Sequence, residues 1–238
     1  MNVVAGDWTQ ALTNFAAQQV TSRVREALWE RGASDDQIGL YRIGYLNREL
    51  PPGLPDRFVK WALSDDKIED ALLFPLTTTL GEIRGFQLRH VERKRGAYSD
   101  YFVDRREACL FGLHQAVEAM WQTGSAFLVE GAFDLFPVQR ATPAVVATLT
   151  ARTNGQMARV LRRIVKRVWL GYDMDETGRR GCADFVSEYG SDFEVYTVAY
   201  PMVNGKVMKD PGDLWEAWGD AQMVPFIKSV LTRDDIFA

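Results

Sequence analysis

Two apolar segments that each end in acidic residues place the strongest constraint on the fold of this chain. The first reads Phe127-Leu128-Val129-Glu130-Gly131, and the second reads Leu170-Gly171-Tyr172-Asp173-Met174-Asp175. Short apolar runs bounded by such residues are typical of buried strands. In an open parallel α/β sheet, ligands bind beyond the carboxyl ends of the strands, so we expect Glu130, Asp173 and Asp175 to converge on one site.

Three carboxylates packed together predict a bound cation. Their mutual repulsion raises their pKa values unless a positive charge neutralises them. Ligation by oxygen alone suits a hard ion such as Mg²⁺. The sequence therefore indicates a metal-dependent chemistry on phosphate groups. In an alternative interpretation each acid only ends a strand or caps a helix, which explains any one of the three acids but not all of them together.

The whole chain limits the class of protein. With 238 residues, it can bury the core of one large domain or of two small ones. No apolar run approaches the roughly 20 residues of a membrane span, and the first residues lack the pattern of a signal peptide. We therefore expect a cytoplasmic protein without a membrane partner. The net charge of -4 argues mildly against nucleic-acid binding, although clusters of cations decide such binding.

The cysteines and histidines argue against a zinc site. Two of each occur, far apart in the sequence: Cys109, Cys182, His90 and His114. No Cys-x-x-Cys pair and no zinc-ligand spacing is present. We expect no zinc in this chain.

Hydrophobic periodicity predicts strands that alternate with helices in the second half of the chain. We expect strands near residues 127–130, 145–149, 168–172 and 193–198, and helices at 110–121, 134–140, 156–166, 176–189 and 221–231. Such an order predicts a parallel sheet with right-handed crossovers, covered by helices.

The first half of the chain is expected to be mixed. Residues 1–33 and 56–64 favour helices, residues 38–46 a short strand, and residues 72–103 a β-rich subdomain. We therefore divide the chain into an N-terminal α+β subdomain at 1–121, a catalytic domain at 122–220 and a C-terminal helix at 221–238.

Three acidic signatures follow one another along the chain. They read Glu130-Gly131-Ala132-Phe133-Asp134, Asp173-Met174-Asp175-Glu176-Thr177-Gly178-Arg179 and Lys209-Asp210-Pro211-Gly212-Asp213-Leu214. In order and rough spacing they resemble the Toprim module, which DnaG-type primases, topoisomerases and some nucleases share.

A second group of segments is similar to DnaG-type primases in particular. Their catalytic core reads approximately Phe-Pro-Ile, Gly-Phe-Gly-Gly-Arg and Leu-Tyr-Gly-Leu, and topoisomerases and Toprim nucleases lack these segments. The counterparts here are Phe74-Pro75-Leu76, Gly85-Phe86-Gln87-Leu88-Arg89 and Leu110-Phe111-Gly112-Leu113. The resemblance covers about residues 38 to 220. It implies an α/β fold in which a Toprim-type parallel sheet flanked by helices follows a smaller mixed α+β subdomain.

The resemblance implies template-directed synthesis of short RNA primers on single-stranded DNA from nucleoside triphosphates, with two or more Mg²⁺ or Mn²⁺ ions. It assigns catalysis to Glu130, Asp173 and Asp175. The acids it implies at the metal site are Glu130, Asp134, Asp173, Asp175, Asp210 and Asp213, of which Asp134 and Asp213 support the others. The cations it suggests for nucleotide or template are Arg84, Arg89, Arg93, Lys94 and Arg95.

Two departures from the family pattern stand out. Gly212 separates Pro211 from Asp213, where the family often has Asp-Pro-Asp. The Lys-Tyr that precedes the Leu-Tyr-Gly-Leu segment in the family is reduced here to Tyr98.

Two other functions remain open on the sequence. A Toprim nuclease would use the same acids with water as the nucleophile, and a nucleic-acid-binding accessory subunit would need no working metal site. The family normally couples its core to a zinc-binding domain and a helicase, and neither has a counterpart in these 238 residues. We therefore expect a phage or mobile-element primase, a split subunit or an excised core, with a replicative helicase or a separate zinc-binding subunit as partner.

Overall fold

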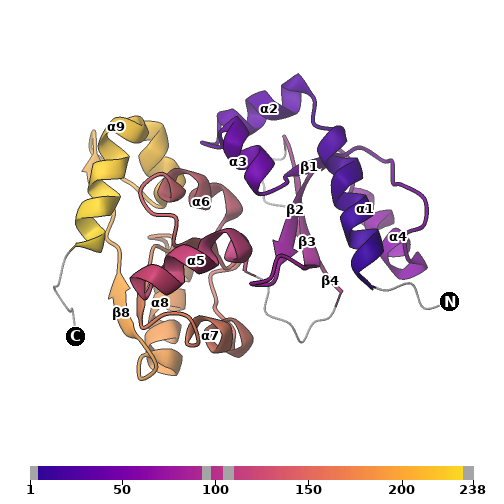
Figure 1. Ribbon diagram of the computed structural model, residues 1–238. Helices are drawn as coiled ribbons and strands as arrows, with labels where there is room; N and C mark the ends of the chain where they lie inside the picture. The colour runs from indigo at the N-terminus through magenta and orange to yellow at the C-terminus, as the bar shows by residue number, and fades with distance from the viewer. Residues whose placement is uncertain (1–4, 93–97, 104–109, 233–238) are drawn as a thin grey trace. The chain divides into compact units, whose positions relative to one another are not determined.

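A computed structural model describes residues 5–92, 98–103 and 110–232. The chain divides into two compact units, one made of residues 1–30 and 34–109, and the other of residues 31–33 and 110–238 (Figure 1). The second unit thus begins about ten residues before the boundary expected at 121, and it takes in a three-residue segment from near the N-terminus. Among the described residues, no helix is long and apolar enough to cross a membrane.

The first unit is a mixed α+β body. Its helices are α1 (Ala5–Gln18), α2 (Ser22–Trp29), α3 (Asp35–Leu40), α4 (Asp56–Ala62) and the short 3-10 turn η1 (Ser64–Asp66). Its strands are β1 (Gly44–Leu46), β2 (Ala71–Thr77), β3 (Ile83–His90) and β4 (Tyr98–Phe102). Within the described residues these strands form an antiparallel sheet in the order β1-β2-β3-β4.

Helix α1 packs closely on this sheet. A Cβ atom at Gly44 would lie 2.4 Å from the Cβ of Ala16, so only glycine lets the strand approach the helix. The buried aromatic rings of Trp8, Phe58 and Tyr101 lie between the helices and the sheet, with ring centroids 5.0 to 6.2 Å apart. Edge-to-face and tilted contacts at such distances are favourable beyond the area that they bury.

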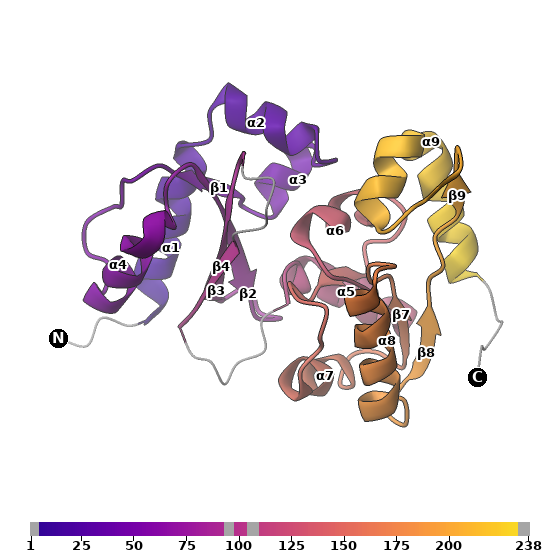
Figure 2. The ribbon, with the colours of Figure 1, turned by 180° about the vertical axis from the view of Figure 1, so that it is seen from behind.

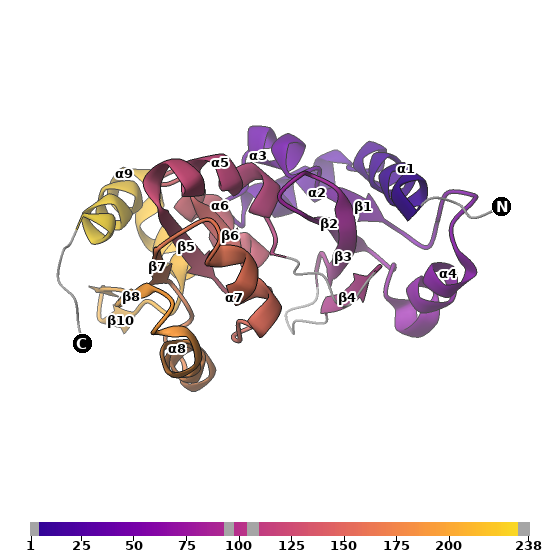
Figure 3. The ribbon, with the colours of Figure 1, turned by 60° about the horizontal axis from the view of Figure 1, so that its bottom comes forward.

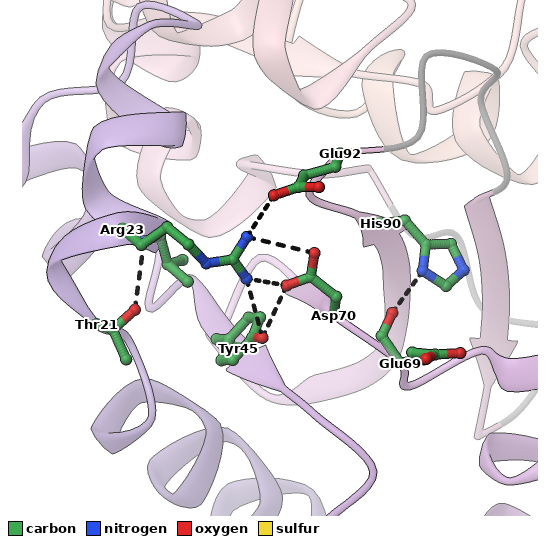
Figure 4. Close-up of polar contacts among 8 residues, drawn as sticks. Thr21, Arg23, Tyr45, Glu69, Asp70, His90 and Glu92 are labelled. Carbon is green, nitrogen blue, oxygen red and sulfur yellow. Dashed lines mark hydrogen bonds and ion pairs between the residues drawn. The ribbon is translucent and has the colours of Figure 1, made fainter.

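A short polar network holds α2 to the sheet (Figure 4). The Arg23 guanidinium donates to both carboxylate oxygens of Asp70, to the Tyr45 hydroxyl and to Glu92. Tyr45 also donates to Asp70 over 2.8 Å. Desolvation would raise the pKa of Asp70, but the hydrogen bonds from Arg23 and Tyr45 outweigh it, and the pKa of Asp70 is lowered.

The structure differs from the expected strand at residues 38–46. Residues 35–40 form helix α3 because Ser34 and Gln37 build a capping box, in which each side chain accepts the backbone N–H of the other. A backbone φ of 53° at Arg42 then ends the helical course, and the strand starts only at Gly44.

The second unit is the expected parallel α/β domain. Its helices are α5 (Leu113–Thr123), α6 (Ala132–Gln139), α7 (Gly155–Leu161), α8 (Glu176–Tyr189) and α9 (Pro211–Leu231). Its strands are β5 (Ser125–Val129), β6 (Val145–Ala147), β7 (Arg167–Leu170), β8 (Glu194–Thr197), β9 (Met202–Val203) and β10 (Lys206–Val207).

Within the described residues, four of these strands form a parallel sheet in the order β6-β5-β7-β8. Helices α5 and α6 cover one face of it, and α7 and α8 cover the other (Figures 2 and 3). The prediction of a parallel sheet flanked by helices, preceded by a mixed α+β body, is confirmed. The last helix begins ten residues earlier than expected, because Asp210 caps it and Pro211 suits its first turn, and it bends at Gly219.

Candidate metal centre

The two strands at the centre of the sheet bring their acids to one edge. Strands β5 and β7 are parallel neighbours, with Leu128 opposite Leu170. The chain therefore leaves both strands at the same end, where Glu130 follows β5 and Asp173 follows β7. The backbone N–H of Asp173 donates to Glu130 Oε1 over 3.0 Å. The expected convergence of these two acids is present in the fold.

The loop before α9 reaches the same edge. The backbone N–H of Met174, between Asp173 and Asp175, donates to the carbonyl oxygen of Lys209 over 2.7 Å. Asp210 follows Lys209 and caps α9, with its Oδ1 accepting the Asp213 N–H over 2.7 Å. The third acidic signature is thereby fastened beside the second.

Asp134 connects the first signature with the third. Its Oδ2 accepts the backbone N–H of Gly131 over 3.1 Å, and its Oδ1 accepts that of Gly212 over 3.3 Å. A Cβ at Gly212 would lie 3.2 Å from both Asp134 Oδ1 and Asp210 Oδ1. The glycine that departs from the Asp-Pro-Asp pattern thus supplies an N–H to the site.

Asp175 and Gly178 shape the start of α8. Asp175 caps the helix, and its Oδ1 accepts the Gly178 N–H over 2.9 Å. A Cβ at Gly178 would lie 2.0 Å from the carbonyl oxygen of Asp173 and 2.6 Å from Glu130 Oε1. The sequence pattern alone assigns no role to Gly178. Its position in the first turn after two acids is the signal that could have identified it.

The acids interact strongly through their charges. Burial, followed by repulsion from Glu130 and Asp210, raises the pKa of Asp173 to about 7. Burial and repulsion from neighbouring acids also raise the pKa values of Glu130, Asp134 and Asp210, although backbone N–H groups partly offset the rise. Ionising all of these carboxyl groups together is therefore unfavourable, and a bound cation would make it favourable.

The donor set suits a hard divalent ion. No group of three or more His, Cys, Asp or Glu side chains within residues 5–92, 98–103 and 110–232 is arranged as a finished metal site. One oxygen each of Glu130, Asp175 and Asp210 already accepts a backbone N–H. Carboxylate oxygens are the ligands that Mg²⁺ and Mn²⁺ prefer, so the chemistry of these residues fits such an ion.

The predicted cations lie in the first unit. Arg84 and Arg89 belong to strand β3, and both side chains are half-buried. Arg84 makes an ion pair with Glu82 over 2.8 Å, at the bulge where β3 leaves its register with β2. Arg93, Lys94 and Arg95 lie outside the described residues.

Comparisons with known proteins agree with this geometry. A protein-family model described as Toprim-like matches residues 127–214. The DNA primase of Aquifex aeolicus is 32% identical over 136 residues, which are 55% of this chain and 27% of the relative. The curated primases that match are covered over only 27 to 39% of their length.

Solved structures extend the likeness to both units. The crystal structure of the Aquifex aeolicus primase, with its zinc-binding and RNA polymerase domains, has a TM-score of 0.73 at 23% identity, over 92% of this chain and 59% of that one. A structure described as the DnaG primase catalytic domain bound to ssDNA has a TM-score of 0.71 at 18% identity, over 93% of this chain and 79% of that one.

Fold and site together define a protein with a Toprim domain, whose acidic signatures occupy the edge of a parallel sheet. More particularly, the chain has the fold and the Toprim core of a DnaG-type primase, and the resemblance inferred from the sequence is confirmed.

Proposed function

We propose that this chain is the catalytic core of a DNA primase, a nucleotidyltransferase that joins ribonucleotides into short primers on single-stranded DNA. The convergence of three acidic signatures on one sheet edge is the observation that carries the proposal. The likeness to a DnaG catalytic domain bound to ssDNA supports the choice of template.

Asp173 and Glu130 are the acids that we assign as principal metal ligands. Asp173 makes no side-chain hydrogen bond to any residue that the structure describes, so its carboxylate is available to a cation. Glu130 keeps Oε2 available while the Asp173 N–H holds Oε1. A divalent ion there would stabilise charge on the attacking and leaving oxygens of nucleotidyl transfer.

The remaining acids divide into ligands and supports. Asp175 and Asp210 each use one oxygen to cap a helix and keep the other for a cation. Both oxygens of Asp134 accept backbone N–H groups, so we assign it to holding the loops together. Asp213 faces Lys206 and the Lys209 N–H, and we place it at the rim of the site.

The cations of the first unit are the proposed contacts to nucleotide or template. Arg89 occupies the last position of the segment that is similar to the family's Gly-Phe-Gly-Gly-Arg, and Arg84 lies five residues before it. Arg93, Lys94 and Arg95 extend this basic stretch along the sequence. Lysine and arginine near a nucleic-acid backbone supply affinity that does not depend on base sequence.

Primer synthesis and nuclease activity can be tested in a single assay. Labelled ribonucleotides are incubated with mixed-sequence single-stranded DNA and Mg²⁺ or Mn²⁺, and the products are examined for both synthesis and cleavage. We expect primers from the wild-type chain and roughly 100-fold fewer or none from Asp173→Asn. Cleavage without synthesis would refute the primase and favour the Toprim nuclease.

A partner is proposed for initiation. Aligning the first two nucleotides is entropically harder than extending a chain that is already annealed. The similar primase of Aquifex aeolicus has a zinc-binding domain beside its RNA polymerase domain, and we propose that a zinc-bearing subunit or a helicase assists this step. We expect extension of an annealed RNA to exceed de novo synthesis by the chain alone. Equal rates of the two reactions would refute the need for a partner.

A further inference from the structure

The short hairpin β9–β10 is built onto the acidic edge of the second unit. Its two-residue turn has positive φ angles at both positions, 50° at Asn204 and 78° at Gly205, as tight hairpins require. The strands pair Val203 with Lys206 and Met202 with Val207.

The pairing gives the hairpin two different faces. Directly opposite residues point to the same side, so Val203 and Lys206 share one face. On that face Val203 is buried, and Lys206 Nζ lies 3.4 Å from Asp213 Oδ2. Met202 and Val207 share the other face and are exposed. The lysine is therefore directed toward the acids by the register of the hairpin.

The backbone next to Lys206 is held by hydrogen bonds, whereas its side chain is mostly exposed. The Met208 N–H donates to the carbonyl oxygen of Pro201 over 3.2 Å, Met208 is buried, and the Lys209 carbonyl accepts the Met174 N–H. The Lys206 side chain is 64% exposed, against 23% for that of Asp213. An ion pair this exposed is weak, so the ammonium group can leave Asp213 at little cost.

The balance of charge at this edge suggests a role for the exposed lysine. Within the described part of the chain, the Lys206–Asp213 pair is the ion pair that joins a lysine or arginine to the six acids. A phosphate ligand would bring further negative charge to this edge. A lysine on a flexible stem, already beside the outermost acid, is suited to neutralise part of it.

We propose that Lys206 is a phosphate-binding residue that pairs with Asp213 in the free protein and turns to the triphosphate of a metal-bound nucleotide. The inference rests on the proposed function, in that the same acids take the metal. It assigns recognition of the triphosphate to the hairpin that follows β8.

The test is calorimetric titration of the full chain with inorganic tripolyphosphate in excess Mg²⁺, which needs no template and no turnover. We expect Lys206→Met to weaken binding about tenfold, as the loss of one charged hydrogen-bond donor does, and Lys206→Arg to retain most of the affinity. Lys228→Met, at an exposed position of α9, is the matched control and should bind as the wild type does. Mg²⁺ alone should bind Lys206→Met at least as tightly as the wild type, because the competitor for Asp213 is gone.

Unchanged tripolyphosphate affinity in Lys206→Met, or no measurable binding by the wild type, would overturn the inference. So would equal losses in Lys206→Met and Lys206→Arg with lowered melting temperatures, because the pair would then be structural. A chain that makes no primers yet binds tripolyphosphate through Lys206 would refute the primase and leave the inference standing. A chain that makes primers and binds tripolyphosphate equally well without Lys206 would support the primase and refute the role of Lys206.

Discussion

The backbone N–H of Met174 donates to the carbonyl oxygen of Lys209 over 2.7 Å, and this bond joins the loop after β7 to the loop before α9. It fixes Asp173 and Asp175, which flank Met174, beside Asp210, which follows Lys209. Because the bond uses only main-chain atoms, it occupies no carboxylate oxygen of these acids. The Asp173 side chain makes no hydrogen bond to any described residue, so a change there should affect chemistry more than folding.

Asp173→Asn should reduce primer synthesis by roughly 100-fold or more, because it removes a charged ligand of the metal ion that neutralises these acids. The metal-free melting temperature should rise, because the substitution relieves the repulsion from Glu130 and Asp210. Synthesis assays and thermal melts in EDTA measure the two effects. Asp192→Asn, at an exposed acid of the same unit, is the control and should change neither quantity. Near-normal synthesis by Asp173→Asn would contradict the metal assignment.

The stability of the metal-free protein should depend on pH in a defined direction. The pKa of Asp173 is raised to about 7, against about 3.9 for an ordinary Asp. Between these values the folded chain binds a proton that the unfolded chain does not, so the free energy of unfolding falls as pH rises from about 4 to about 7.

Urea unfolding in EDTA between pH 4.5 and 7.5 checks this expectation. The slope of the unfolding free energy against pH should be smaller in Asp173→Asn than in the wild type. It should not be zero, because the pKa values of Glu130 and Asp210 are raised as well. Mg²⁺ should restore stability most at the highest pH, where the carboxylates are ionised. An identical slope in the variant and the wild type would show that Asp173 is not the group responsible.

Gly178→Ala should impair the site without any loss of charge. The added Cβ would lie 2.0 Å from the Asp173 carbonyl oxygen, so the start of α8 has to move and Glu130 with it. We expect a loss of about 1–3 kcal/mol in unfolding free energy and a larger fractional loss of synthesis. Gly39→Ala is the matched control, because a Cβ at this helical position has no neighbour within 4 Å, and it should be neutral or slightly stabilising. Similar behaviour of the two variants would exclude the steric explanation.

Arg89→Ala should weaken binding of single-stranded DNA and lower the slope of log affinity against log salt by roughly one unit, as the loss of one phosphate contact does. Fluorescence anisotropy over a series of salt concentrations measures both. Arg25→Ala removes an exposed cation of helix α2 that pairs with Asp35, and it should leave the slope unchanged. An unchanged salt dependence in Arg89→Ala would indicate that this arginine makes no contact with a DNA phosphate.

The sequence predicted those parts of the site that follow directly from the ends of strands. The alternation of strands with helices predicted the parallel sheet. The acids at two of its strand ends then predicted the convergence of Glu130 with Asp173, because neighbouring parallel strands end at the same edge. The assignment of catalytic and metal-binding roles stays a prediction. The approach of Gly178 to the Asp173 carbonyl, and the bond from the Gly212 N–H to Asp134, could not be predicted, since both join segments whose spacing only the folded chain determines.

The hydrophobic pattern predicted the wrong bounds for two elements. The apolar residues from Ile38 to Leu46 suggested one strand, but the capping box at Ser34 and Gln37 commits the first of them to α3. The basic stretch after α7 was expected to continue the helix to Lys166, whereas the helix ends at Leu161. Arg162 and Arg167 pair instead with Asp192 and Glu194.

The segment Arg31–Ala33 belongs to the second unit, although the chain then returns to the first. Arg140 donates to the Gly32 carbonyl across 108 residues of sequence, and Arg31 lies over the Phe133 ring. During synthesis on a ribosome these three residues emerge long before α6 and α9, so the second unit cannot complete its packing by folding from a contiguous stretch. A fragment that starts at Leu110 would leave Trp215 and Pro137 without the Gly32 peptide that covers them. We therefore expect the second unit expressed alone to be more stable when this short peptide is supplied, either in trans or by a permuted chain.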